Sequence, residues 1–501
     1  MSVSRGKIQG SMDPLVCEYV TTPDLHKELK RCYQTFLDIN KAHVLMLHKQ
    51  GIISHSDAKK ILKVNQEMAA MGDEPTFEYD PGLEDIYPNL EKYLIDKVGI
   101  ETGGRQHTAR SRNDLTVTEE RIDARRYFLE ISELYNRVRH TILKLANETT
   151  DAVFAGYTCL QPSEPITMAH YWSAVLNGMQ RDYDRIKSVW TRLNINPLGG
   201  CSMGSTSYPI DREMTSELLG FDSPMDNSLD SVAGLDYILE MMAAFSIAAM
   251  TLSRVATDLY VWSTPEFGYV EVGDSVAACS SIMPQKKNPV TLEYIRATAG
   301  NIEGLYLATW TGMKNTPYTL VVDTYTVAAT NMWPMFEQLR GLLKIFNLTL
   351  ETLTFHRERM FKMAFGNFCT VTELANAIVR EDSVSFRKAH DVVAGVVCRM
   401  LEAGKTSDQI TSQDINVIAE KEFHFKTALS DEAIRNAMNP VRIAEAKKTL
   451  GGPATVEVKR QLEKLSASLS RDDIELQQRQ ERVNQAKENL EKAVENLINL
   501  D

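Results

Sequence analysis

The sequence predicts an all-α protein that is built from long helices. Apolar residues recur at three- and four-residue spacing over most of the chain, and several of these stretches exceed 25 residues without an internal proline or glycine cluster. No segment shows sustained alternation of apolar and polar residues, so almost no sheet is expected. Helices of this length cannot bury their apolar stripes inside a small domain, which indicates an extended bundle or packing against other subunits.

The positions of glycine and proline divide the chain into helices and loops. Gly51 and the polar turn at 54–57 separate the first two helices, whereas 73–114 contains three prolines and a Gly–Gly pair and is expected to be loop and short helix. Shorter helices follow over 363–462 and end at a Gly–Gly–Pro turn. The longer helices are predicted, in chain order, over 24–50, 55–72, 114–150, 165–193, 228–262, 288–313 and 325–362.

The C-terminal segment combines a serine-rich stretch with a seven-residue repeat. Residues 466–470 contain three serines and are interpreted as a joint. Beyond them, Leu476, Val483, Leu490 and Leu497 recur every seven residues. The repeat fits a coiled-coil seam and fits equally well an amphipathic helix that docks on its own domain.

Composition excludes several classes of protein. The 501 residues carry 55 basic and 67 acidic side chains, a net charge of −12, so no basic surface for nucleic acid or an anionic membrane is expected. Seven scattered cysteines indicate free thiols in a reducing compartment rather than a disulfide framework. The N-terminus lacks the apolar core of a secretory signal, and Glu240, Arg254 and Asp258 interrupt the most apolar stretch. We therefore expect a soluble cytoplasmic protein, in which an anionic substrate would need locally gathered positive charge.

The segment 103–114, GGRQHTARSRND, places cations and hydrogen-bond donors directly before a long helix. Arginine suits bidentate binding of carboxylates, and a helix N-terminus adds affinity for anions. A solvated basic turn is the alternative interpretation. Three further irregular segments lie between the helices, at 152–164, 194–212 and 264–289, and loops on a rigid helical scaffold commonly carry function.

The last of these loops runs into CSSIMPQKKNPVTLE at 279–293. Ser280 and Ser281 supply hydroxyls, and Lys286 and Lys287 could face an anion. A surface loop with a basic pair has the same composition.

SSIMPQKKNP resembles the signature loop of the aspartase/fumarase superfamily, and its Gln-Lys-Lys form is that of argininosuccinate lyases. Further matches follow in the same order along most of the chain, so the sequence is identified as a member of this family. They include HTARSRND (107–114), GYTCLQ (156–161), PIDRE (209–213) and TELANAIVRE (372–381).

The resemblance implies an aspartase/fumarase-like all-α fold of three helical domains. Its central long-helix bundle forms a twenty-helix core in a homotetramer, and each active site takes residues from three subunits. The expected divisions are an N-terminal helical domain with an active-site loop, 1–113; the central bundle, 114–362, with the signature loop at 273–290; a C-terminal helical domain, 363–465; and the coiled-coil-like helix, 466–501.

The resemblance also implies a carbon–nitrogen lyase that eliminates fumarate from a small anionic succinyl compound, by anti β-elimination, without metal or cofactor. Such an enzyme removes a weakly acidic proton beside a carboxylate and must stabilise a dianionic aci-carboxylate. By position, Ser280 resembles the base, Lys286 and Asn288 resemble the residues that hold the carboxylate, and Glu293 matches the acidic partner of the general acid. The matching substrate-binding positions are Ser111, Arg112, Asn113, Thr158 and Gln161.

The chain departs from the family at the general acid. The usual Thr-His pair is Thr158-Cys159 here, so Glu293 lacks its imidazole partner. A carboxylate nearby should raise the pKa of a thiol rather than lower it. Cys159 could act as a neutral donor, His107 could take the role, or the leaving group could need little help. We hypothesise that His107 matters more here than in ordinary relatives.

A second departure concerns the leaving group. The family grips it with a Tyr, a Gln and a Lys, and these positions are Leu320, Tyr325 and Ala328 here. We therefore expect an N-substituted aspartate other than argininosuccinate as substrate. A genuine argininosuccinate lyase and a catalytically silent structural relative are the alternatives.

Three cysteines add a further question, because Cys159, Cys201 and Cys279 each lie in one of the active-site loops. They could bind a metal or sense redox state, but their spacing is not a metal motif. Replacement of a small residue explains Cys201 and Cys279, so no metal is expected.

Overall fold

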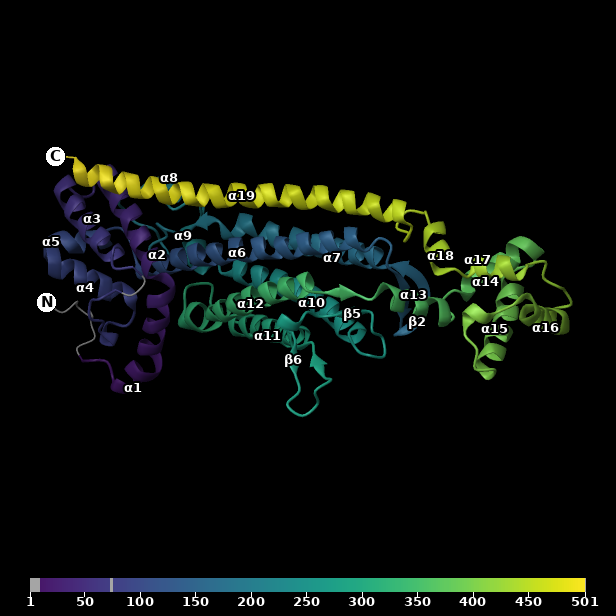
Figure 1. Cartoon of the computed structure of the whole chain (residues 1–501). Helices are drawn as coiled ribbons and strands as arrows, with labels where there is room; N and C mark the ends of the chain where they lie inside the picture. Colours follow the sequence, from purple (N-terminus) through teal and green to yellow (C-terminus); the bar gives the residue numbers. More distant parts are fainter. Residues whose placement is uncertain (1–9, 73–74, 501) are drawn as a thin grey trace.

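A computed structural model describes residues 10–72 and 75–500 and shows an elongated molecule (Figure 1). The long helix α2 and several short helices form one end, a bundle of long helices forms the middle, and a small helical domain forms the other end. This arrangement confirms the predicted all-α class. In chain order the N-terminal end contains α1 (Pro14–Val16), the π-helical turn η1 (Cys17–Thr21), α2 (Thr22–Lys49), α3 (His55–Ala69), η2 (Pro81–Leu83), α4 (Ile86–Val98), α5 (Ile100–Gly103) and η3 (Gly104–His107).

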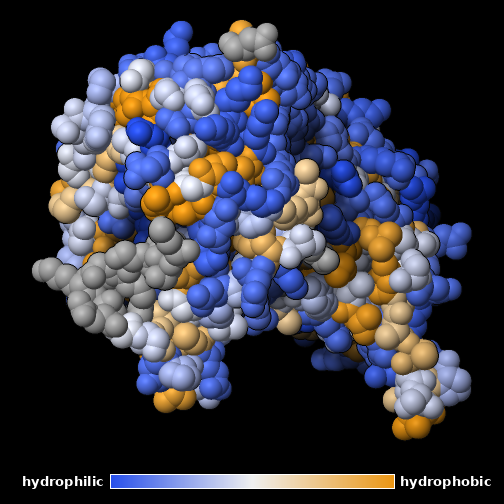
Figure 2. Space-filling model, turned by 90° about the vertical axis from the view of Figure 1, so that its left-hand side faces the viewer, coloured by the Kyte–Doolittle hydropathy of each residue, from blue (hydrophilic) through white to orange (hydrophobic). Residues whose placement is uncertain are grey.

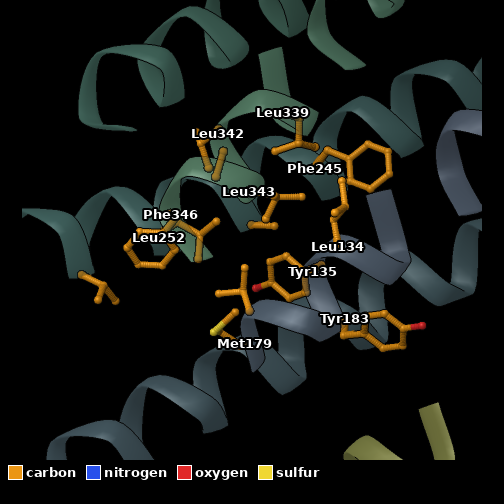
Figure 3. Packing of buried hydrophobic residues seen from close by; sticks show 14 of the residues in the cluster. Leu134, Tyr135, Met179, Tyr183, Phe245, Leu252, Leu339, Leu342, Leu343 and Phe346 are labelled. Carbon is orange, nitrogen blue, oxygen red and sulfur yellow. The ribbon is translucent and has the colours of Figure 1, made fainter. Parts of the chain in front are cut away.

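The bundle buries a continuous apolar core between its long helices (Figure 3). Tyr135, Phe245 and Phe346 come from three different helices and all lie inside it. The bundle helices are α6 (Arg112–Glu148), α7 (Met168–Leu193), α10 (Asp236–Trp262), α11 (Val290–Met313) and α12 (Met332–Glu351), with the short helices α8 (Arg212–Leu218) and α9 (Ser228–Ala233) and the turns η4 (Asp274–Val276), η5 (Asp323–Ala328) and η6 (Ala329–Asn331) between them.

Two helices predicted to be continuous are interrupted in the structure. The predicted helix 228–262 is α9 and α10, because the chain turns at Gly234 before α10 begins. The predicted helix 325–362 stops at Glu351, because Thr354 and Phe355 leave the helix and pair with a distant strand. Periodicity did not reveal either break, since apolar residues continue through both.

Sheet is confined, among the described residues, to four two-stranded pairs. The longest lies at 153–167, where we expected an irregular loop. It forms because Val153, Phe154 and Ala155 are buried against the bundle, so a short strand needs no extended alternation in sequence. The strands are β1 (Val153–Thr158) with β2 (Gln161–Thr167), β3 (Ile195–Asn196) with β4 (Ser223–Pro224), β5 (Val270–Glu271) with β8 (Thr354–Phe355), and β6 (Ala278–Cys279) with β7 (Lys287–Asn288).

The C-terminal helix is longer than predicted. α19 (Thr455–Asn499) runs unbroken through the serines at 466–470, so the predicted joint is wrong. Leu465 and Leu469 keep the buried stripe continuous there, and serine costs a helix little when packing supports it. The helices before it are α13 (Arg357–Gly366), α14 (Val371–Asp382), α15 (Phe386–Glu402), the turn η7 (Ser407–Gln409), α16 (Ser412–Phe423), α17 (Asp431–Ala437) and α18 (Pro440–Ala446).

α19 packs on its own chain along the whole bundle, which decides between the two interpretations of the heptads (Figure 1). A buried ion pair of 2.9 Å joins Arg139 of α6 to Asp472. Further along, Leu490, Val494 and Leu497 enter the apolar core of the N-terminal helices. The N-terminal core is therefore completed by the last residues of the chain.

α10 is long and apolar enough, by composition alone, to cross a membrane. In the structure it is a central helix of the bundle, with α7, α11 and α12 against it. This packing accounts for the apolar residues on its buried half.

Candidate active site

The predicted segment 103–114 is built into the fold by Asp114. Ser111 caps α6 and Asp114 closes the capping box. The buried Asp114 carboxylate also accepts the N–H groups of Gly199 and Cys201, both at 2.9 Å. Two of the loops singled out in the sequence are therefore joined by one side chain.

The loop that meets Asp114 requires glycine at one position. Gly199 has φ +94°, and a Cβ there would lie 2.9 Å from the Arg212 side chain. Arg212 in turn donates to the carbonyls of Leu198 and Met225. The Cys201 thiol is buried and donates to Ala109 O, so it is a packed residue of this loop.

His107 lies inside the N-terminal end, against a tyrosine. Its Nδ1 is 2.7 Å from the Tyr87 hydroxyl, and Arg110 donates to the same hydroxyl at 3.1 Å. Burial, with the neighbouring charges of Arg110 and Arg112, lowers the pKa of His107 to about 4. The imidazole is therefore neutral near pH 7.

Arg112 and Asn113 stand at the first turn of α6. Arg112 forms ion pairs with Glu84 and Asp85 at 2.8 and 2.9 Å, and Asn113 donates to Ser202 O at 3.1 Å. The two carboxylates come from the turn before α4, so this turn orients the guanidinium.

A cavity of about 280 Å³ opens beside these two residues. Leu320 and Tyr325, two of the positions where the chain departs from its family, line it together with Arg112 and Asn113. Ala328, the third such position, is buried and packs instead toward Gly312 of α11. The structure thus brings two of the three altered positions to the predicted substrate-binding residues.

Sequence reasoning missed the acidic side of this cavity. Asp24 and Glu28 of α2 line it, with Glu84 and Asp85. Burial, and then the charge of Asp85, raises the pKa of Glu28 to about 7. Asp24 and Glu28 are one helical turn apart, but no local signal distinguishes them from a solvated helix face.

Thr158, Cys159 and Gln161 belong to the β1–β2 hairpin. Thr158 pairs with Gln161 across the turn, and Cys159 and Leu160 both adopt the left-handed conformation that a two-residue hairpin turn requires. All four residues are exposed. The hairpin emerges at the end of the bundle near the C-terminal domain (Figure 1).

Ser280 and Lys286 lie in the loop that joins β6 to β7, and Asn288 lies on β7. From here on, the name signature loop refers to residues 279–288 of the predicted segment 273–290. The backbone N–H groups of Ile282 and Met283 donate to Ser280 Oγ at 3.4 and 3.1 Å. Ion pairs from Lys287 to Glu271 and Asp274, at 2.7 and 2.6 Å, hold the base of the loop.

The signature loop hangs below the body of the molecule in Figure 1 and remains separate from it in the turned view of Figure 2. Ile282 near its tip is 83% exposed. Glu293, exposed on the first turn of α11, accepts a hydrogen bond of 3.0 Å from Tyr260.

The predicted residues therefore form three groups in one chain. His107, Ser111, Arg112 and Asn113 lie at the N-terminal end, Ser280, Lys286 and Asn288 on the signature loop, and Thr158, Cys159 and Gln161 at the opposite end of the bundle (Figure 1). Cys201, Cys159 and Cys279 are divided in the same way, and the described residues contain no group of side chains arranged to hold a metal ion.

Comparison with solved structures defines the class of protein. EDDS lyase, solved with bound formate and, as a variant, with bound fumarate, shares 28% identity and a TM-score of 0.86 over 98% of this chain and 97% of that one. A class II fumarase from Schistosoma mansoni has the same fold at 18% identity, with a TM-score of 0.67 over 85% of this chain and 92% of that one. The fold is that of the aspartase/fumarase superfamily.

Sequence comparison then gives the family. The Lyase family pattern matches residues 6–304, and that of the argininosuccinate lyase C-terminal region matches 368–445. Argininosuccinate lyase 1 of Shouchella clausii is 42% identical, over 93% of this chain and 94% of its own. Argininosuccinate lyase of Methanocaldococcus jannaschii is 35% identical, over 97% and 98%. The chain belongs to the argininosuccinate lyase family and is a carbon–nitrogen lyase, as the sequence motifs indicated.

Proposed function

We propose that this chain is a cytoplasmic enzyme that eliminates fumarate from an N-substituted aspartate other than argininosuccinate. Membership of the family, and a similar lyase solved with fumarate, support the elimination. The observation that carries the choice of substrate is the cavity, in which Arg112 and Asn113 adjoin Leu320 and Tyr325. Two of the three side chains that would grip the amino-acid end of argininosuccinate are replaced there.

In the proposed reaction, Ser280 removes a proton from the carbon beside the substrate carboxylate. The electron pair of that C–H bond enters an aci-carboxylate, which Lys286 and Asn288 stabilise. The pair then forms the C=C bond of fumarate while the C–N bond breaks, and its electrons leave on nitrogen. The departing nitrogen then takes up a proton and becomes the free amine.

The surroundings of Ser280 support its role as the base. A serine hydroxyl becomes a base only after losing its own proton, and donors around its oxygen favour the anion. The N–H groups of Ile282 and Met283 are such donors. Lys286, in the same loop, adds a positive charge.

The active site would be assembled from three chains of a homotetramer. One chain holds its three groups of predicted residues apart, and the long helices expose apolar side chains that a partner could cover. These include Ile247 and Met250 of α10, Leu307 and Trp310 of α11, and Leu348 of α12.

The proton donor to nitrogen is better assigned to Cys159 than to His107. The lowered pKa of His107 keeps it neutral, and its Nδ1 is engaged by Tyr87 inside the chain. Cys159 is exposed on its hairpin, where a partner's site could use it. Replacing each by alanine compares them: the larger fall in turnover identifies the donor.

Argininosuccinate itself is the second candidate substrate, because the relative that is 42% identical is named argininosuccinate lyase 1. The test is fumarate release, followed by absorbance, from argininosuccinate and from a series of other N-substituted aspartates, with Ser280→Ala as the inactive control. Fastest release from argininosuccinate would contradict our choice of substrate. No release from any compound, with an intact tetramer, would indicate a catalytically silent relative.

A further inference from the structure

The cavity beside Arg112 has a strongly acidic wall. Four carboxylates line it, from Asp24 and Glu28 on α2 and from Glu84 and Asp85 before α4. Among the described lining residues, Arg112 carries the single positive charge, and ion pairs with Glu84 and Asp85 already compensate it. Such a wall favours a cationic ligand and opposes an anionic one.

A second part of the wall is apolar and aromatic. Leu320, Val322 and Tyr325 line it from the segment after α11, and Phe36 contributes from α2. An aromatic ring and aliphatic side chains suit the carbon chain of an amine. The wall therefore offers no cationic side chain for a carboxylate.

A further acidic residue, outside the cavity lining, follows two of the lining positions along α6. Asn113 and Thr116 line the cavity from α6, and Glu120 follows one turn later on the same helix face. Glu120 is 3% exposed, and its Oε2 is buried without a hydrogen-bond partner. Because burial keeps this acid largely protonated near pH 7, a cation in the cavity would favour its ionised form.

The pKa of Glu120 reflects its burial and the charged groups around it. Burial, with a contribution from Glu28, raises the pKa of Glu120 to about 8. The charges of Arg31 and Arg121 act in the opposite direction and do not outweigh burial. Lys27 pairs with Asp24 at 3.2 Å, but Lys27 is exposed and Asp24 partly exposed, and such pairs contribute little.

We infer that this cavity binds the leaving amine of the substrate as a cation that bears no carboxylate, such as a diamine or a guanidinoalkylamine. The inference rests on the proposed function, since it specifies the group that departs from fumarate. It separates this chain from a lyase whose leaving group is an amino acid.

The reverse reaction tests the inference with matched compounds. Fumarate is supplied to the full-length enzyme with agmatine or arginine, and with 1,4-diaminobutane or ornithine; in each pair the second compound adds only a carboxylate. The nitrogen lone pair forms the new C–N bond at one alkene carbon of fumarate while the C=C π bond breaks; the other alkene carbon takes up a proton, and the nitrogen loses one. We expect fumarate to be consumed at least about tenfold faster with the compound that lacks the carboxylate.

Binding measurements separate failure of the inference from failure of the proposed function. Titration calorimetry compares agmatine with arginine on the intact enzyme, which requires no turnover. At least about tenfold tighter binding of agmatine supports the inference even if no compound reacts. Equal or tighter binding of arginine overturns it, as does equal or faster addition of arginine.

Two variants locate the effect. Glu28→Gln keeps an oxygen for the N–H of Ile86, which Glu28 now accepts, and Asp24→Asn changes a partly exposed site. Each should reduce the preference for agmatine by about three- to tenfold. Glu18→Gln, an exposed acid on the preceding turn that does not line the cavity, is the control and should keep the preference. An unchanged preference in both cavity variants would overturn the inference.

Discussion

The N-terminal segment 107–114 and the signature loop (279–288) carry equally specific motifs but lie in opposite surroundings. The first is held by bonds within its own chain, because Asp114 joins the start of α6 to the loop at Gly199 and Cys201. The second stands away from the body, and residues 281–287 are exposed. In the N-terminal segment a change would alter stability and chemistry together. In the signature loop, a change can alter the chemistry without altering the stability.

The largest effect is expected from Ser280→Ala. Loss of the base should lower fumarate release by about 10²- to 10⁴-fold, while the midpoint of thermal unfolding changes little because Ser280 is only half-buried and residues 281–287 beside it are exposed. Ser281→Ala removes a neighbouring hydroxyl and is the matched control. An inactive Ser281 variant beside an active Ser280 variant would refute the assignment.

Asp114→Ala tests the other region. It leaves the buried N–H groups of Gly199 and Cys201 without an acceptor, so the free energy of unfolding should fall by about 3 kcal/mol. Urea unfolding measures this, and turnover should fall with it. Glu101→Ala, at an exposed acid on α5, provides the control. A fully stable Asp114 variant would show that this segment is no better anchored than the loop.

His107 provides a pH-dependent test of the same region. Because its pKa in the folded chain is about 4, the unfolded imidazole takes up a proton first as the pH falls below about 6.5, and folding stability is lost between these values. His107→Gln removes this contribution. Compared with the wild type, it should gain stability as the pH falls from 6.5 to 4, by up to about 3 kcal/mol. Parallel urea-unfolding curves across this range would contradict the buried, neutral state.

The smallest effect is expected at the base of the signature loop. Lys287→Met removes exposed ion pairs to Glu271 and Asp274, which solvent screens. The midpoint of thermal unfolding should move by no more than about 2 °C. A larger loss, measured by calorimetry, would mean that the loop depends on its chain as the N-terminal segment does.

Local pattern predicted some elements well and others not at all. The long helix α6 was predicted from its apolar periodicity, with a start two residues after the observed one at Arg112. The break at Thr354 and the hairpin at 153–167 were missed, because both depend on partners far away in the chain. The serines at 466–470 misled for the same reason, since α6 and α7 support α19 there.

The candidate site shows the same division. The motifs identified His107, Arg112, Ser280 and their neighbours, because each motif is contiguous in sequence. The acids at Asp24 and Glu28 could not be recognised, since their meaning arises only where α2 passes the residues after α11.

By itself, the sequence determined the helical class and the family of this lyase, and it predicts the reacting groups, because periodicity and contiguous motifs are local properties. The tertiary structure alone decided that α19 docks along its own chain and that Leu320 and Tyr325 share a cavity with four carboxylates. Both results depend on burial and charge summed over segments distant in sequence. A local sequence pattern does not show which distant segments will contribute this burial and charge.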